Sequence, residues 1–363
     1  METTDFLVVG GGLAGLYSAY RLSQAGLPFE LLEGSGQLGG RIAAAPAPEP
    51  HPTVLDVGPT WFWPHQQRMQ MLLKELEIDW FPQYADGDAL FDTGTSTGPV
   101  RTPGAGAMLS YRVAGGMTAL IDGLRSRLDS QRIRTEVEVI GAQRDADGWV
   151  VSARDLREER TFRARSLVAA LPPRMLASGL TPEHWATSQL QGALASQQTW
   201  MAAQAKFVAV YPEPFWRAEG LAGDAFSRTG PLVEIHDATE EKSGTAALFG
   251  FVGLSANQRA SRGHQSLADA CLDQLGTLFG EKAKDPLYSC LKDWSVEPLV
   301  AAPQDLAEPP AHANFPMSRF TDELESLDLH LAGSEYARRE PGYLEGALEA
   351  SDHWLQRLGI DPN

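Results

Sequence analysis

The stretch VVGGGLAGLYSAYRL, residues 8–22, contains glycines at the spacing G-x-G-x-x-G. An apolar run at residues 6–9 precedes these glycines and predicts a short buried strand. Residues 13–24 follow with apolar side chains at helical spacing. Strand, tight turn and helix in this order are the setting in which such glycines hold a dinucleotide's diphosphate at a helix N-terminus. We therefore predict a nucleotide-binding turn made by Gly10, Gly12, Leu13, Ala14 and Gly15.

A second predicted strand, residues 29–32, ends on an acidic residue. Glu33 lies 18 residues after Gly15. A carboxylate at this place accepts hydrogen bonds from the 2′- and 3′-hydroxyls of an adenosine ribose and disfavours a 2′-phosphate, so NADP is not expected. The glycines alone are equally compatible with a tight turn that binds no ligand. The strand, the helix and Glu33 in one register favour nucleotide binding.

Composition bounds the class of protein. The 363 residues exceed what one hydrophobic core usually supports, so two lobes are expected. A formal net charge of −17 argues against a nucleic-acid partner. The two cysteines, Cys271 and Cys290, give no disulfide framework, and the eight histidines show no metal-ligand spacing. No apolar run is long enough to span a membrane, and the first strand begins too close to Met1 for a signal peptide. We expect a cytoplasmic protein that neither associates with a membrane nor binds a metal ion. The sequence does not indicate the oligomeric state.

Apolar periodicity predicts further elements along the chain. Helices are expected near residues 69–76, 115–128, 266–279 and 344–358. Strands are expected near residues 136–140, 149–153, 166–171, 202–211, 246–254 and 329–332. Residues 84–110 are rich in Gly, Thr and Asp and are expected to form a loop. The apolar C-terminal strand favours a return to the N-terminal sheet, which would make the nucleotide lobe discontinuous.

The residues alone leave the role of three features open. Lys206 lies in an alternating strand pattern, where a lysine is usually a solvent-facing charge. Tyr343 precedes a predicted helix and could belong to the core. The aromatic run at residues 61–63 could also be core, or it could face a flat ring system.

Taken in order, the segments resemble the flavin-containing amine oxidase superfamily, and the monoamine oxidase group most of all. The similarity covers the chain from end to end and is therefore more specific than a nucleotide fingerprint. The matching pieces are VVGGGLAGL (8–16), LGGR (38–41), DVGPTWFWP (56–64), GGMTAL (115–120), ALPP (170–173), AKFVAVYPEPFWR (205–217), AGSE (332–335) and GYLEGALEA (342–350).

The resemblance implies an α/β fold with two lobes. One lobe would be a Rossmann-like FAD-binding domain of the amine oxidase and p-hydroxybenzoate hydroxylase type, formed by residues 1–72, 112–180 and 318–363. The other would be an α+β substrate domain with a mixed sheet, formed by residues 73–111 and 181–317.

The resemblance also implies contacts with FAD. Glu33 would bind the adenosine ribose, Val137 the adenine through its backbone, and Arg41 the pyrophosphate side. Glu335 would reach the phosphate or ribityl region, and Leu344 would offer its N–H to the flavin pyrimidine ring. The other residues predicted to bind FAD are Gly10, Gly12, Leu13, Ala14, Gly15, Gly34, Gly39, Gly40, Gly58, Pro59, Thr60, Trp61, Leu171, Pro172, Trp294, Gly333, Ser334, Gly342 and Tyr343.

Two residues are predicted to act in catalysis. Lys206 matches the family lysine that holds a water against flavin N5, where its charge can stabilise developing superoxide. Tyr343 matches one wall of the family's aromatic cage. The implied reaction moves a hydride equivalent from the α-carbon of an amine to flavin N5, and O₂ then reoxidises the flavin with release of H₂O₂. The implied partners are thus a small amine-type substrate and O₂.

Departures from the family pattern concern the substrate. The second tyrosine of the cage is expected downstream of Trp294, but no Tyr or Trp occurs between Ser295 and Leu331. No cysteine occurs there either, so we expect the FAD to be non-covalent. The segment between Trp63 and Gly115 is too short for the family's helical insertion, which predicts an open site. Two alternatives remain: an FAD-dependent desaturase or dehydrogenase on a non-amine substrate, and a non-catalytic FAD-binding maturation factor.

Overall fold

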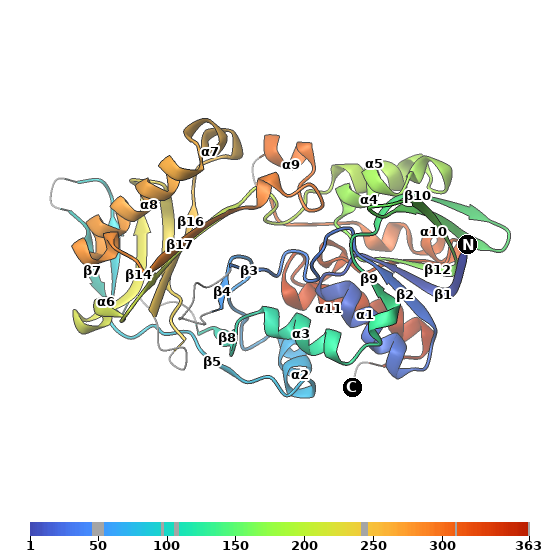
Figure 1. The fold of residues 1–363 in the computed structure, drawn as a ribbon, viewed down its shortest axis with the longest axis horizontal. Coiled ribbons are helices and arrows are strands. Elements are labelled where there is room, and N and C mark those ends of the chain that lie inside the picture. The colour runs from blue at the N-terminus through green and yellow to red at the C-terminus, as the bar shows by residue number, and fades with distance from the viewer. Residues whose placement is uncertain (46–53, 96–97, 105–108, 241–245, 309–310, 362–363) are drawn as a thin grey trace.

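The computed structural model describes residues 1–45, 54–95, 98–104, 109–240, 246–308 and 311–361. Within these residues, two seven-stranded sheets lie toward opposite ends of an elongated molecule, and helices pack on both (Figure 1). The chain passes between the two sheets several times, so each lobe is assembled from separated segments.

The first sheet has the strand order β10-β11-β12-β1-β2-β9, and β18 also pairs with β12. Its strands are β1 (Glu2–Val9), β2 (Phe29–Leu32), β9 (Ile133–Arg134), β10 (Glu138–Asp145), β11 (Gly148–Arg154), β12 (Glu159–Ala169) and β18 (Leu329–Leu331). β1 runs parallel to β2 and to β12 and is buried on both faces, which explains its continuous apolar run. Phe6 and Val8 point to one core, and Leu7 and Val9 point to the other.

Helices cover both faces of the first sheet. The core with Phe6 includes side chains of α1 (Leu13–Gln24), α2 (Gln67–Glu75), α3 (Thr118–Ser126) and α11 (Leu344–Leu355). The core with Leu7 includes side chains of α4 (Pro173–Gly179), α5 (Ser188–Ser196) and α10 (Thr321–Ser326). The domain division stays a prediction, and α5 packs on the first sheet although its residues were assigned to the substrate domain.

The C-terminal segment joins the N-terminal sheet, as the sequence predicted. Leu329 to Leu331 of β18 pair in parallel with Leu167 to Ala169 of β12. α11 then packs against α1, where Tyr17 donates a hydrogen bond to Asp352 (2.7 Å). The two ends of the chain therefore build one wall of the same lobe.

The second sheet has the order β17-β13-β16-β15-β14-β6-β7 and is mixed, because β14 and β6 are parallel while the other pairs are antiparallel. Its strands are β6 (Asp88–Asp92), β7 (Val100–Pro103), β13 (Ala205–Tyr211), β14 (Leu221–Ser227), β15 (Leu232–Asp237), β16 (Ala246–Val252) and β17 (Tyr288–Asp293). Side chains of α8 (His264–Phe279) pack on this sheet, and α7 (Ala256–Arg262) precedes that helix. The predicted loop at residues 84–110 is wrong: β6 and β7 form there because β14, distant in sequence, pairs with β6.

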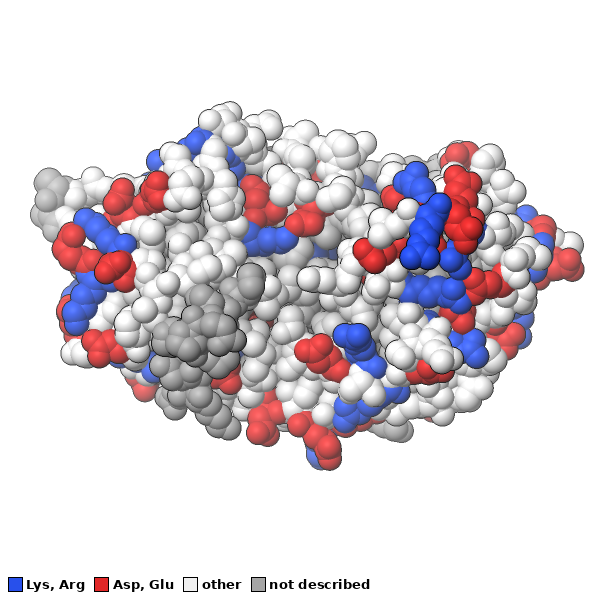
Figure 2. Space-filling model, viewed as in Figure 1, with Lys and Arg blue, Asp and Glu red and all other residues white. Residues whose placement is uncertain are grey.

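Short elements complete the described chain. They are β3 (Ala44–Ala45), β4 (Leu55–Asp56), β5 (Trp80–Pro82), β8 (Tyr111–Val113), α6 (Phe215–Ala218), α9 (Pro303–Ala307) and the 3-10 helices η1 (Ser130–Arg132), η2 (Pro182–His184), η4 (Glu281–Lys284), η5 (Trp294–Val296), η6 (Met317–Arg319), η7 (Ser334–Tyr336) and η8 (Gln356–Leu358). No helix in the described part of the chain has the length and apolar character needed to cross a membrane. On the face drawn in Figure 2, acidic and basic side chains are interspersed.

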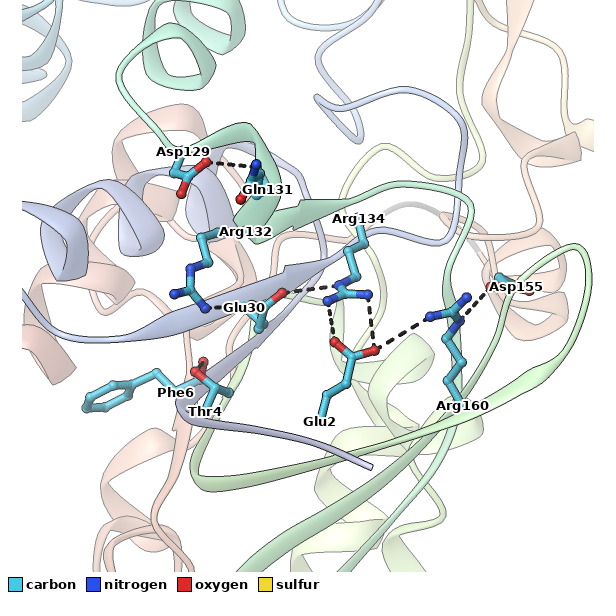
Figure 3. Close-up of polar contacts among 10 residues, drawn as sticks. All are labelled: Glu2, Thr4, Phe6, Glu30, Asp129, Gln131, Arg132, Arg134, Asp155 and Arg160. Atoms are coloured by element: carbon cyan, nitrogen blue, oxygen red, sulfur yellow. Dashed lines mark hydrogen bonds and ion pairs between the residues drawn. The ribbon is translucent and has the colours of Figure 1, made fainter.

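An ion-pair network ties together β12, β1, β2 and β9, which are neighbours in the first sheet (Figure 3). Glu30 of β2 accepts hydrogen bonds from Arg132 (2.9 Å) and Arg134 (3.2 Å). Arg134 also pairs with Glu2 of β1, and Arg160 of β12 approaches Glu2 at 3.6 Å. Only 9% of the Glu30 side chain is exposed, so solvent screens its pairs less than those of a surface carboxylate.

We expect Glu30→Gln to weaken this network. The change leaves two arginines without their shared charge partner, so the free energy of unfolding should fall by about 1–2 kcal/mol. Urea denaturation at low and high salt measures it, and the loss should shrink as salt rises. Glu213→Gln, which removes the exposed pair with Lys282, is the control and should cause no measurable change. Equal effects of the two variants would contradict a special role for Glu30.

Candidate active site

A cavity of about 1620 Å³ lies at the carboxyl ends of β1, β2 and β12, where Val9, Leu32 and Ala170 line it. Open α/β sheets bind ligands at this edge. The cavity exceeds the ~300–1,000 Å³ of ordinary small-ligand sites. It has room for a dinucleotide and a substrate together.

The three glycines of the first turn serve different purposes. Gly10 has a φ of +104°, and a Cβ on it would lie 2.6 Å from the carbonyl oxygen of Ala170. A Cβ on Gly15 would lie 1.9 Å from the carbonyl oxygen of Gly10. A Cβ on Gly12 would meet no protein atom closer than 3.7 Å, and Gly12 lines the cavity. Packing thus requires Gly10 and Gly15, whereas Gly12 keeps open a space that a ligand can fill.

The N-terminus of α1 opens on the same space. Gly12 is its N-cap and supplies no side-chain cap, so the first N–H groups of the helix have no partner within it. Leu13 and Ala14 of this turn line the cavity. Gly39 lies opposite, and its N–H donates to the carbonyl of Gly11 (2.9 Å). These donors and the positive end of the helix fit a diphosphate.

Glu33 stands beside this turn at the cavity wall. Its carboxylate accepts hydrogen bonds from the N–H groups of Gly11 (2.6 Å) and Ser35 (2.8 Å). These two bonds fix both carboxylate oxygens and leave lone pairs for further donors. The arrangement fits the ribose hydroxyls of the predicted FAD. Val137 also lines the cavity, and its N–H donates to the carbonyl of Glu33 (2.9 Å).

Gly12→Ala and Gly15→Ala should separate binding from folding. We expect Gly12→Ala to leave the free energy of unfolding of the FAD-free protein within about 0.5 kcal/mol of wild type, because its φ of −74° suits alanine and no protein atom is crowded. Its Kd for FAD should rise at least tenfold, roughly 1.4 kcal/mol. Gly15→Ala should lower the free energy of unfolding by about 2 kcal/mol or more.

Chemical denaturation of the FAD-free proteins and titration with FAD measure the two effects. A Gly12→Ala variant that binds FAD as tightly as wild type would contradict the assignment of this space to the diphosphate.

Arg41 and Glu335, which are far apart in the sequence, form an ion pair. Arg41 donates to the two carboxylate oxygens of Glu335 at 2.6 and 3.1 Å, and also to Ser334 Oγ (3.1 Å). Glu335 is fully buried. Burial acts to raise the pKa of Glu335, but the charge and hydrogen bonds of Arg41 hold it below its usual range. Arg41 lines the cavity, whereas Glu335 stands behind it and orients it.

The structure brings nearly all the predicted site residues to one cavity. Gly15 and Glu335 are the two predicted residues outside the lining: Gly15 lies inside α1, and Glu335 lies behind Arg41. The other predicted residues in the lining are Gly34, Gly39, Gly40, Gly58, Pro59, Thr60, Trp61, Leu171, Pro172, Trp294, Gly333, Ser334, Gly342, Tyr343, Leu344 and Lys206.

Lys206 reaches the cavity from β13 of the second sheet. The alternating pattern suggested an exposed face, but β13 is buried along its whole length between β16 and β17. The Lys206 ammonium donates to the carbonyl of Gly58 (3.1 Å) and to Thr60 Oγ1, and lies 4.1 Å from the ring centroid of Phe249. Burial lowers the pKa of Lys206 to about 7, against the opposing charge of Asp56. Lys206 can therefore change its charge near neutral pH.

A second helix N-terminus faces the same cavity as Lys206. α11 begins at Leu344, its N-cap is Tyr343, and no side chain caps it. Gly342, Tyr343, Leu344 and Ala347 line the cavity. The Leu344 N–H therefore has no partner within the helix and lies at its positive end. The wall suits a ligand group that gains negative charge.

Aromatic rings that sequence reasoning missed surround Tyr343. The Tyr343 ring lies 5.6 Å from Trp63 and 5.9 Å from Trp200, and all three residues line the cavity. Trp63 belongs to the aromatic run at residues 61–63, for which the sequence left two positions open, in the core or against a flat ring system, but it is not among the predicted site residues. Trp200 stands just before the strand predicted near residues 202–211, in a stretch where no motif marked a site residue. Other lining residues outside the predicted set include Gln66, Met201, Gln204, Phe251 and Lys292.

Comparisons with known proteins agree with this arrangement. A family model described as flavin containing amine oxidoreductase matches residues 88–352, and one described as NAD(P)-binding Rossmann-like domain matches residues 8–76. A probable flavin-containing monoamine oxidase A from Dictyostelium discoideum is 22% identical over 453 aligned residues, with 95% of each chain covered. Putrescine oxidase from Kocuria rosea is 22% identical over 81% of this chain and 82% of that protein.

Solved structures share the fold. Putrescine oxidase bound to putrescine superposes with a TM-score of 0.82 at 18% identity, covering 98% of this chain and 99% of that one. Cyclohexylamine oxidase from Brevibacterium oxydans gives a TM-score of 0.80 at 18% identity, covering 96% and 97%. The predicted two-lobed α/β fold is confirmed.

Proposed function

We propose that this chain, which belongs to the flavin-containing amine oxidoreductase family, oxidises the carbon–nitrogen bond of an amine to an imine. The predicted family is confirmed, and with it an FAD-dependent enzyme. The non-catalytic alternative is therefore set aside. The substrate, the electron acceptor and the roles of single residues belong to the proposal.

One observation carries it: the buried amine of Lys206 reaches the same cavity as the glycine turn, Glu33 and Tyr343. Lys206 comes from the second sheet, and the other residues come from the first lobe. A dinucleotide held at the glycine turn can extend along the cavity toward Lys206. Burying a lysine amine costs much of its hydration free energy. This cost favours a chemical role for Lys206 over a purely structural one in the turn at Gly58.

FAD, when bound, would supply the redox chemistry: it would accept the hydride equivalent, which carries two electrons, from the α-carbon of the amine, and O₂ would then take up these two electrons. The overall change is R–CH₂–NH₂ plus O₂ to R–CH=NH plus H₂O₂, and water then converts the imine to an aldehyde and ammonia. Glu33, the α1 N-terminus and Arg41 would hold the adenosine and diphosphate. The Leu344 N–H would hold the pyrimidine ring.

The chain's own residues have three tasks in this scheme. The rings of Tyr343 and Trp63 give an apolar surface that positions a neutral amine and excludes water. Lys206, when protonated, places a positive charge where the negative charge of reduced oxygen develops. No side chain need remove a proton from carbon, because the hydrogen leaves with its electron pair.

We expect Lys206→Met to slow reaction of the reduced enzyme with O₂ by about 100-fold, because one charged group near the developing anion is lost. In wild type this rate should fall as pH rises through about 7, where Lys206 loses its proton. The variant should show no such inflection. Rapid mixing of reduced enzyme with O₂ from pH 5.5 to 9 measures both.

Lys292→Met is a matched control. Lys292 lines the same cavity and pairs in register with Lys206 across β17 and β13, but its ammonium bonds to Glu297. It should keep both the O₂ rate and the inflection. An unchanged O₂ rate in Lys206→Met would contradict the role assigned to Lys206.

Anaerobic mixing with an amine panel tests the reaction itself. Primary, secondary and polyamine substrates should be represented, and at least one should bleach the flavin absorbance, with air restoring it and producing peroxide. If no amine bleaches the flavin, amine oxidation is wrong. If an amine bleaches it but air does not restore it, the enzyme is a dehydrogenase with another acceptor.

A further inference from the structure

Trp200 is an aromatic residue of the cavity lining to which the proposed amine oxidation gives no role. Trp200 lies in the segment between α5 and β13, and its side chain packs on the backbone of Gly342, next to Tyr343. A Cβ on Gly342 would lie 2.6 Å from the Trp200 ring. The Trp200 and Tyr343 rings are inclined by 48° and both line the cavity.

The backbone of Trp200 is held by the buried ion pair. Its N–H donates to a Glu335 oxygen (3.2 Å), and its carbonyl accepts from Arg41 (3.0 Å). Both main-chain groups of Trp200 are therefore tied to charged side chains, and such hydrogen bonds are stronger than neutral ones. The position of its Cα is thus fixed from the cofactor side of the cavity.

The ring is held from the other side by His312. The two rings are stacked, with centroids 4.1 Å apart and planes inclined by 20°. On either side of His312, the N–H groups of Ala311 and Asn314 donate to Gln198 and Gln197 (both 2.9 Å). The segment that carries His312 is therefore anchored to the residues that lead into Trp200.

A buried salt bridge locks the base of both segments. Arg174 of α4 pairs with Asp305 of α9 (2.7 Å), and each side chain is at most 3% exposed. Arg174 also donates to the carbonyls of Ala195 and Ser196, and Asp305 accepts from the N–H of Thr199 (3.0 Å). Three sets of contacts therefore fix Trp200: the Arg174–Asp305 pair below its segment, the hydrogen bonds to its backbone, and the stacked ring of His312. This degree of fixation favours a role for the Trp200 side chain beyond filling space.

We propose that Trp200 is a specificity-determining residue of this enzyme, the fixed wall that confines the carbon chain of the substrate beside Tyr343. The inference rests on the proposed amine oxidation. The Trp200 and Tyr343 rings are in contact, with centroids 5.9 Å apart, and form one continuous aromatic wall. The substrate class that fits is an amine on a slender, unbranched chain, because such a chain can lie flat against this wall. Aromatic faces also attract an ammonium group, which favours arrival of the protonated amine at this wall.

The test uses Trp200→Ala and Trp200→Phe as FAD-loaded enzymes. Hexylamine is the slender probe and 2,2-diphenylethylamine the bulky one, and anaerobic flavin reduction separates the Kd of each amine from its limiting rate. Calorimetry with hexyltrimethylammonium adds a binding readout, because this cation has no nitrogen lone pair to oxidise. The visible flavin spectrum reports cofactor binding in each variant.

We expect Trp200→Ala to raise the Kd of hexylamine and of hexyltrimethylammonium about tenfold, with little change in the limiting rate. The preference for the bulky amine, relative to hexylamine, should rise at least tenfold as the wall is removed. Trp200→Phe should restore most of the hexylamine affinity. Trp80→Phe is the control, since Trp80 of β5 is not among the cavity-lining residues, and it should change none of these values.

The inference is overturned if Trp200→Ala retains FAD and leaves both Kd values and the preference unchanged. If wild-type flavin is reduced by no amine, the proposed function fails separately, and calorimetry still decides on Trp200: weaker binding to Trp200→Ala supports it, whereas equal or absent binding overturns it. If Trp200→Ala loses FAD, His312→Ala gives the decision, because it removes the ring stacked on Trp200. A raised Kd of hexyltrimethylammonium in that variant supports the inference, and an unchanged Kd overturns it.

Discussion

The ion pair between Arg41 and Glu335 is the contact on which the site depends. It joins residues 294 positions apart and holds both main-chain groups of Trp200 as well. The segments that carry Arg41, Trp200 and Glu335 are far apart in the sequence, and this contact fixes all three around the buried Glu335 carboxylate. Breaking such a pair by removing one partner costs about 3–5 kcal/mol, because the other charge stays in a low-dielectric setting. The predicted cofactor site and the proposed substrate wall at Trp200 therefore both depend on this ion pair.

The electrostatics of the cavity contrast with those of the whole molecule. The chain carries a formal net charge of −17, whereas the cavity lining has as many cationic as acidic side chains and also receives two uncapped helix N-termini. The cationic residues are Arg41, Arg125, Lys206 and Lys292, and the acidic ones are Glu33, Asp122, Glu138 and Glu297. A diphosphate, a ring that gains charge on reduction and a developing oxygen anion all need such an environment. Lys206 differs from Arg41 in that its charge is adjustable, because burial opposes it while Asp56 supports it. In the proposed reaction, permanent donors would bind the cofactor, and Lys206, whose pKa is lowered by burial, would act in the reaction with O₂.

Local patterns predicted the parts of the fold that local physics controls. The helix predicted over residues 13–24 is α1, and the strand predicted over residues 29–32 is β2, because glycine turns and apolar periods act within a few residues. β6 and β7 were missed because β6 pairs with β14, more than a hundred residues away, and β7 pairs in turn with β6. Trp200 was missed for a similar reason: its place beside Tyr343 is set by Glu335, Arg41 and His312, none of them its neighbours. The position of Glu335 behind Arg41, rather than at the cavity wall, likewise required the folded chain.

The central claim is that the two ends of this chain close on one non-covalently held FAD. The most direct measurement is the ratio of flavin to protein in the purified chain after incubation with FAD and gel filtration, followed by acid precipitation. The account predicts one FAD per chain, with all of it released into the supernatant as intact FAD. A protein that stays colourless with excess FAD, or that keeps its flavin in the acid pellet, would contradict it.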